Sequence, residues 1–196
     1  FSLDHKMIGK QFLWFGLMML FLGGALALLF RWQLGYPETQ LPGMSMVPES
    51  VWDEGTSWLA RTLPYGVIGP EFYNALVTMH ATIMVFFVVA PILVGCFGNF
   101  LIPLMIGTDD MAFPVLNMLS FWITVGAGVV LLASFFVEGG AAASGWTAYT
   151  PLSVKEIYTG VGVGQDLWCF SLIILGIGSL MGAINYITTI VNMRTE

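Results

Sequence analysis

Charged side chains are scarce in this sequence. Asp, Glu, Lys and Arg make up 9% of its 196 residues, whereas about a quarter of a soluble domain is charged. Hydrophobic residues make up 57% of the chain and the mean hydropathy is +0.84. This sequence has too few polar residues to cover the surface of a soluble fold of this size. We therefore expect a protein embedded in membrane lipid.

Basic residues and cysteines are also few. Six Lys and Arg stand against twelve acids, and the pI is about 4.7. This excludes the basic patch that nucleic acid requires, so we expect no nucleic-acid partner. The two cysteines, Cys96 and Cys169, lie in separate apolar runs. The expected topology places them in opposite leaflets, too far apart for a disulfide.

Four apolar runs are long enough to cross a bilayer, which takes about 20 residues. They cover residues 8–30, 72–106, 116–137 and 166–193. Pro91 lies inside the second run and predicts a kink there, and Asp166 is the expected N-cap of the last helix. We therefore predict an all-α integral membrane bundle with four transmembrane helices, forming a single membrane domain over residues 1–196.

The connections between these runs differ in length and composition. The first is long and rich in proline, with a short helix expected around residues 51–60. Lys and Arg are divided evenly between the two sides of the predicted membrane, so the positive-inside rule leaves the orientation open. The chain starts with Phe1 rather than Met and stops soon after an apolar run. We therefore expect a piece of a longer or split polypeptide.

His80 is the most informative polar residue inside an apolar run. Imidazole binds haem iron well, and a metal-bound histidine usually donates its other ring N–H to an acceptor that fixes the tautomer. A histidine bonded only to a neighbouring helix or to water is the competing interpretation. One histidine does not define a haem site, so both interpretations stay open at this point.

Other polar residues near the ends of the runs have two interpretations as well. Asp110 is either a functional acid or a solvated loop residue, as we expect of Asp109 beside it. Asn99, Asn117 and Asn185 either hold water chains or join helices. For Arg31, at the end of the first run, position alone favours an interfacial anchor.

Four stretches of the sequence have a distinctive order of residues. They read DHKMIG (4–9), HATIMVFFVVAPILVGCFGNFLIPLMIGTDDMAFPVLNMLSFW (80–122), GWTAYTPL (145–152) and GAINYITTIVNM (182–193). They closely resemble subunit I of the haem-copper oxygen reductases, the cytochrome c oxidase family. The resemblance implies the N-terminal portion of that subunit, with the first four transmembrane helices of a larger bundle.

The resemblance implies a role for several residues at a low-spin haem. His80 matches one axial ligand of the haem iron, with haem a as the expected type. Arg31 matches the arginine that bonds a haem substituent, and Trp146 the tryptophan near the haem propionates. The family's other haem ligands, its copper ligands and its cross-linked His-Tyr pair come from later helices. High-spin haem and copper are therefore expected in the complete subunit, with no catalytic residue in this chain.

The resemblance also implies a proton route. Asp110 matches the carboxylate at the mouth of the family's D proton pathway. The asparagines that organise water in that pathway match Asn99, Asn117 and Asn185, with Ser179 above them. The implied orientation places the N-terminus and Asp110 on the cytoplasmic side of a bacterial inner membrane, and His80 toward the other side.

Some positions depart from the family pattern. Asn117 is the only asparagine kept after the DMAFP motif, and Gln33 replaces a frequent acid, which weakens an outer-loop cation site. Ile173 replaces a frequent histidine and Thr150 a frequent proline. Because none of these is the haem ligand or Asp110, we expect a divergent bacterial member.

We therefore expect part of the catalytic subunit of a terminal respiratory oxidase. Electrons from cytochrome c would pass through the low-spin haem to oxygen, with proton uptake at Asp110 coupled to proton pumping. The expected partners are the remaining helices of subunit I, oxidase subunits II and III, cytochrome c and membrane lipid. The alternatives are a quinol oxidase of the same family and a non-catalytic scaffold or assembly protein. A nitric oxide reductase is disfavoured by Asp110 and the asparagines.

Overall fold

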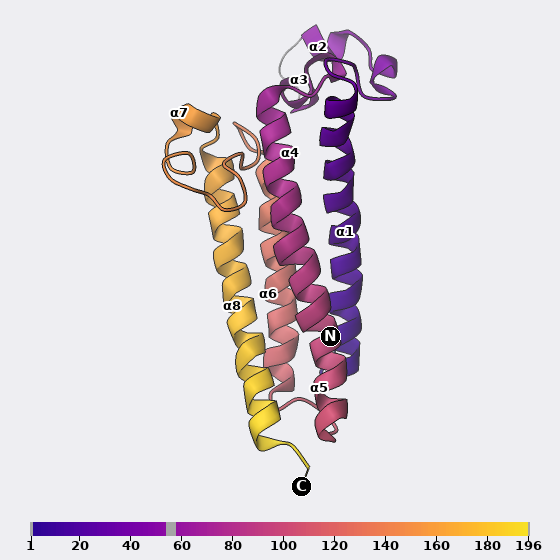
Figure 1. Cartoon of the computed structure of the whole chain (residues 1–196), viewed down its shortest axis with the longest axis vertical. Coiled ribbons are helices and arrows are strands. Elements are labelled where there is room, and N and C mark those ends of the chain that lie inside the picture. The colour runs from indigo at the N-terminus through magenta and orange to yellow at the C-terminus, as the bar shows by residue number, and fades with distance from the viewer. Residues whose placement is uncertain (1, 54–57, 196) are drawn as a thin grey trace. The chain divides into compact units, whose positions relative to one another are not determined.

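Four long helices make up most of the chain (Figure 1). The computed structural model describes residues 2–53 and 58–195. The helices that are long and apolar enough to cross a membrane are His5–Gly35 (α1), Pro70–Ile106, Pro114–Phe136 and Val163–Asn192 (α8). Within the described ranges there is no strand. The prediction of an all-α, multi-pass membrane protein with four spans is confirmed.

Proline and glycine mark the ends of the helices. Pro70 and Pro114 occupy the first helical position of the second and third spans, where the missing N–H has no helical partner to lose. Gly107 ends the second span in a left-handed conformation with φ of 75°, and its N–H donates to the Pro103 carbonyl. The prediction that Asp166 caps the last helix is wrong, because α8 already begins at Val163 and Asp166 lies exposed in its first turn.

The second span changes its helical type along its length. It consists of α4 (Pro70–Thr82), the π-helical segments η3 (Ile83–Val89) and η4 (Pro91–Gly98), and α5 (Asn99–Ile106). Pro91 has no N–H to donate, and a helix commonly adapts to such a lost bond by local widening. Pro91, where we expected a kink, is therefore the first residue of the second of two π-helical segments.

Short helices occupy the connections. The third span itself consists of α6 (Pro114–Ala133) and the 3-10 turn η5 (Ser134–Phe136). The connection after it holds α7 (Glu156–Thr159), which precedes α8. The first connection holds η1 (Met44–Met46), α2 (Ser50–Asp53), α3 (Trp58–Thr62) and η2 (Pro64–Gly66). Where one helix was expected over residues 51–60, α2 and α3 stand at the two ends, and positions 54–57 lie outside the described residues.

The described residues pack as two compact units. Unit 1 comprises the chain up to Phe21, Ile83–Leu131, and the chain from Cys169 onward; unit 2 comprises Leu22–Thr82 and Leu132–Trp168.

Aromatic rings and glycines pack the helices of unit 1. The Phe12 ring on α1 meets the Phe121 ring on α6 edge-on, with centroids 5.1 Å apart. A Cβ at Gly95 would lie 2.5 Å from the Phe12 ring, and one at Gly16 would lie 2.5 Å from Ile92 Cγ1. These glycines therefore allow α1 and η4 to approach closely.

Unit 2 has its own apolar cluster. Its buried members are Leu41, Leu63, Ile68 and Leu76, which come from the first connection and α4. The Leu41 N–H donates to the Gly66 carbonyl over 2.9 Å. The described part of the first connection is thus packed against the helix that carries His80.

Candidate haem-ligand and proton-route sites

The ring of His80 is fixed by a backbone carbonyl. His80 lies near the end of α4, half-buried, with Nδ1 2.8 Å from the carbonyl oxygen of Gly23 on α1. A carbonyl oxygen only accepts hydrogen bonds, so Nδ1 carries the proton and donates it. The Phe30 ring also packs against the imidazole, with centroids 5.5 Å apart. In the neutral imidazole, Nε2 then keeps its lone pair, as a metal-ligating histidine requires.

The loop that contains Trp146 is attached to the same helix. The Thr78 hydroxyl donates to the Asn74 carbonyl over 2.8 Å and accepts from the Gly145 N–H over 3.0 Å. Gly145 directly precedes Trp146, whose side chain is 43% exposed. The structure thus places Trp146 in unit 2 with His80 and anchors its loop to α4 at Thr78, two residues before the candidate ligand.

Arg31 lies in the last turns of α1, also in unit 2, with an exposed side chain. The two residues that follow it hold buried polar atoms without a hydrogen-bond partner, Trp32 Nε1 and Gln33 Oε1. Because buried polar atoms are nearly always paired in complete structures, these two remain available to a further polar partner. Among the described residues no three His, Cys, Asp or Glu side chains are grouped to hold a metal ion. One imidazole is enough for one axial position of haem iron.

Two of the three predicted asparagines bond to each other in unit 1. The Asn117 Nδ2 donates to Asn99 Oδ1 over 2.6 Å, and both residues are at most 1% exposed. The Asn99 Nδ2 in turn donates to the Gly95 carbonyl over 2.6 Å and to the Tyr186 hydroxyl over 3.0 Å. The backbone carbonyl of Asn99 contacts His5 Nδ1 over 2.8 Å. This amide cluster joins α1, η4, α5, α6 and α8.

Asn185 does not bond to the other two asparagines, but holds the loop that carries Asp110. Its Oδ1 accepts from the Phe113 N–H over 2.8 Å. The Nδ2 of Asn185 is buried and has no protein partner. One turn on, Thr189 Oγ1 accepts from the Ala112 N–H over 2.9 Å. The short loop is therefore held against α8 in unit 1.

Asp110 is half-buried in this loop, whereas Asp109 is exposed, as expected. The Asp110 Oδ1 accepts from the Met111 N–H over 2.7 Å, and its backbone carbonyl accepts from the Thr108 hydroxyl over 3.3 Å. The carboxylate thus makes one local hydrogen bond within the loop, as a purely structural loop acid would.

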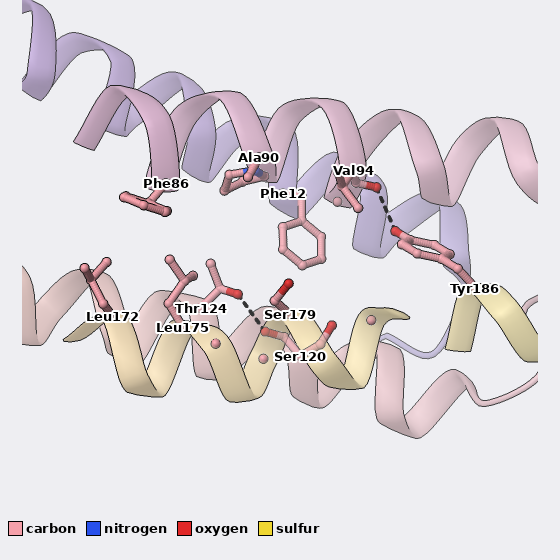
Figure 2. Close-up of a pocket in the computed structure, with 15 residues that line it drawn as sticks. Phe12, Phe86, Ala90, Val94, Ser120, Thr124, Leu172, Leu175, Ser179 and Tyr186 are labelled. Atoms are coloured by element: carbon pink, nitrogen blue, oxygen red, sulfur yellow. Dashed lines mark hydrogen bonds between the residues drawn. The ribbon is translucent and has the colours of Figure 1, made fainter. Parts of the chain in front are cut away.

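A cavity of about 290 Å³ lies within unit 1. Figure 2 shows Ser120, Thr124 and Ser179 facing Phe86, Ala90 and Val94 across it, with Tyr186 at one end. The Ser120 hydroxyl donates to the Asn117 carbonyl over 2.7 Å. Ser179 is exposed on α8 and joins this cavity lining. The cavity is therefore linked to the amide cluster through α6.

Sequence reasoning missed several polar residues of this region: His5, Ser120, Tyr186 and Thr189. A usable signal existed for Ser120 and Thr189, because each is a hydroxyl residue about one helical turn after a singled-out asparagine. For Tyr186, the only signal was its place directly after Asn185.

Comparison with known proteins identifies the family. Residues 7–196 match the family described as Cytochrome C and Quinol oxidase polypeptide I. The chain belongs to this family. It is 40% identical over 196 residues to cytochrome c oxidase subunit 1 of Synechocystis sp., covering 100% of the chain and 30% of that protein. It is 38% identical over 194 residues to cytochrome c oxidase subunit 1 of Thermostichus vulcanus, covering 99% and 29%. Cytochrome c oxidase subunit 1 of Yarrowia lipolytica is 51% identical over 125 residues, covering 64% of the chain and 23% of that protein. The chain thus spans about a third or less of the length of these relatives.

Proposed function

We propose that the chain is the N-terminal part of the catalytic subunit of a terminal respiratory oxidase, and that it binds one face of a low-spin haem through His80. The observation that supports this proposal most directly is the hydrogen bond from His80 Nδ1 to the Gly23 carbonyl, which leaves Nε2 free for iron. High-spin haem and copper would bind to other parts of the complete subunit. The relatives named cytochrome c oxidase favour cytochrome c over quinol as the electron donor.

The residues of unit 2 fit the haem and would tune it. A bound low-spin haem supplies reversible one-electron transfer at its iron. The Gly23 carbonyl would orient the His80 ring and fix its tautomer for the iron. Arg31 would direct positive charge at a ring substituent, and Trp146 would lie near the propionates. We infer haem a as the type, with the remaining helices of subunit I and subunits II and III as partners.

Unit 1 would serve proton uptake. Asp110 would collect protons from the cytoplasmic side, the side on which we also place the N-terminus. Buried amides suit the path above it, because they orient water without holding a charge in a low dielectric. The Nδ2 of Asn185, which has no protein partner, can donate a hydrogen bond to such a water. Ser179 and the cavity would continue the route that is coupled to pumping.

The experiment that tests this function is His80→Ala in the complete oxidase. We expect loss of the low-spin haem absorption band, because the variant has no ring nitrogen to hold the iron. The matched control is His5→Gln, which changes the chain's other histidine. The His5→Gln oxidase should keep the low-spin band. A low-spin band of normal shape and intensity in His80→Ala would contradict the proposal.

A further inference from the structure

The hydroxyl of Tyr186 holds two groups of the second span at once. It accepts from Asn99 Nδ2 over 3.0 Å and donates to the Val94 carbonyl over 2.7 Å. The second of these bonds is visible in Figure 2. Tyr186 lies on α8, so this single side chain ties α8 to η4 and to the start of α5 within unit 1.

The bond from Tyr186 completes the orientation of the Asn99 amide. One N–H of Nδ2 goes to the Gly95 carbonyl and the other to the tyrosine hydroxyl, so Oδ1 is left to accept from Asn117. Rotating the amide by half a turn would place its oxygen against the Gly95 carbonyl, and two acceptors repel. The 2.6 Å contact between Asn99 and Asn117 leaves no space for a water molecule between them.

Gly98 makes room for this arrangement. A Cβ at position 98 would lie 3.1 Å from the Tyr186 hydroxyl oxygen and 3.2 Å from its Cζ. Only glycine therefore leaves the ring undisturbed at this distance, and the hydroxyl reaches Asn99, the next residue along the chain.

We infer that Tyr186 is a positioning residue that keeps the Asn99–Asn117 pair closed on the proton route, an inference that rests on the proposed function. For water to enter between the two amides, Asn99 must swing away from Asn117, and its Nδ2 must leave the Gly95 carbonyl and the tyrosine hydroxyl. The hydroxyl does not itself carry protons along the route, because its hydrogen is committed to the Val94 carbonyl.

The same hydroxyl connects the pair to the cavity. A tyrosine hydroxyl has one donor and two acceptor sites, and the bonds to Val94 and Asn99 use one of each. Tyr186 also lines the cavity. The remaining acceptor site is thus suited to a water molecule on the cavity side of the pair, so opening would join this water to the water on the Asp110 side.

The test is Tyr186→Phe in the complete oxidase, with proton uptake followed in a single turnover. The phenylalanine keeps the ring but removes the hydroxyl. Loss of one neutral hydrogen bond should favour the open pair roughly three- to tenfold. We expect proton uptake to accelerate by up to that factor and fewer protons to be pumped per electron, with a normal haem spectrum.

Two further variants make the result specific. Gly98→Ala should act in the same direction, because its methyl group displaces the hydroxyl, and it serves as an independent test if Tyr186→Phe does not assemble. Thr188→Val is the matched control: its hydroxyl donates only to the Ile184 carbonyl of its own helix, so uptake and pumping should match the unmodified oxidase.

The outcomes separate this inference from the function on which it rests. Unchanged uptake and pumping in Tyr186→Phe, together with blocked uptake in Asp110→Asn, overturns the inference alone. Slower uptake in Tyr186→Phe overturns it too, because the hydroxyl would then belong to the conducting chain. Normal uptake in Asp110→Asn overturns the proposed proton route itself.

Discussion

Arg31 carries one of the few positive charges of the chain and lies in the same unit as His80. If it contacts a haem substituent, Arg31→Met should lower the reduction potential of the low-spin haem, because a positive charge stabilises the electron-rich reduced form. The absorption band should shift as well. Redox titration of the complete oxidase measures both effects.

Arg61 provides the control for this change. It is exposed on α3 in unit 2, and Arg61→Met should leave band and potential unchanged. An unaltered spectrum and midpoint in Arg31→Met would make Arg31 an interfacial anchor only.

Asp110 and Asp109 are adjacent acids with different surroundings, which makes them a natural pair of variants. Asp110→Asn should leave haem content and rapid haem reduction intact but slow steady-state oxygen consumption, by roughly a hundredfold if a positioned acid is essential, and abolish pumping. Asp109→Asn should be nearly normal, because its side chain is exposed. Near-normal turnover with full proton release in vesicles containing Asp110→Asn would make Asp110 a loop residue.

Single residues differ in how far the sequence could predict them. His80 and Asp110 were predictable as candidates for a functional site. Placing an ionisable group in or beside a membrane-spanning run costs free energy, so such a residue is expected to have a function. Tyr186 was not, since a tyrosine in an apolar helix is usually an interfacial or packing residue. Its partner Asn99 lies 87 positions away in the sequence, and only the packing of α8 against the second span brings the two together.

At the scale of elements, the approach of α1 to η4 depends on glycine. Gly95→Val should destabilise the protein by about 1–3 kcal/mol through overpacking, because its side chain would meet the Phe12 ring, already 2.5 Å from an ideal Cβ. Thermal denaturation of the detergent-solubilised oxidase, followed by loss of the haem spectrum, measures the effect.

Gly126→Val is the control for this substitution, since Gly126 is exposed and has no atom within 4 Å of an added Cβ. A second change, Phe12→Ala, should restore part of the stability lost in Gly95→Val. Equal midpoints for the two glycine variants would show that the close approach has no energetic importance.

The lengths of the apolar runs predicted that the four long helices exist, but not where they end. α1 continues to Gly35, beyond the apolar run expected over residues 8–30, because Arg31 and the following residues extend the helix until the chain reaches Pro37. The π-helical turns around Pro91 had no signature in hydropathy, since that measure records composition and not hydrogen-bond register.

For the chain as a whole, composition was enough to predict the lipid environment and the all-α class. It did not predict which helices bond to each other, because in lipid this choice depends on particular polar contacts. Two such contacts are Ser171 Oγ to the Ala127 carbonyl, at 2.8 Å in unit 1, and Trp168 Nε1 to Thr82 Oγ1, at 3.0 Å in unit 2. The orientation across the membrane and the single-domain organisation remain predictions.

The acceptor that fixes the His80 ring belongs to the peptide backbone. A side-chain acceptor can be deleted by one codon change, but every amino acid that replaces Gly23 brings its own carbonyl oxygen. Genetic drift at position 23 therefore leaves the acceptor in place as long as α1 keeps its path. The tautomer of the candidate ligand is therefore insensitive to the identity of the side chain at position 23, and depends on the ring and on the path of α1.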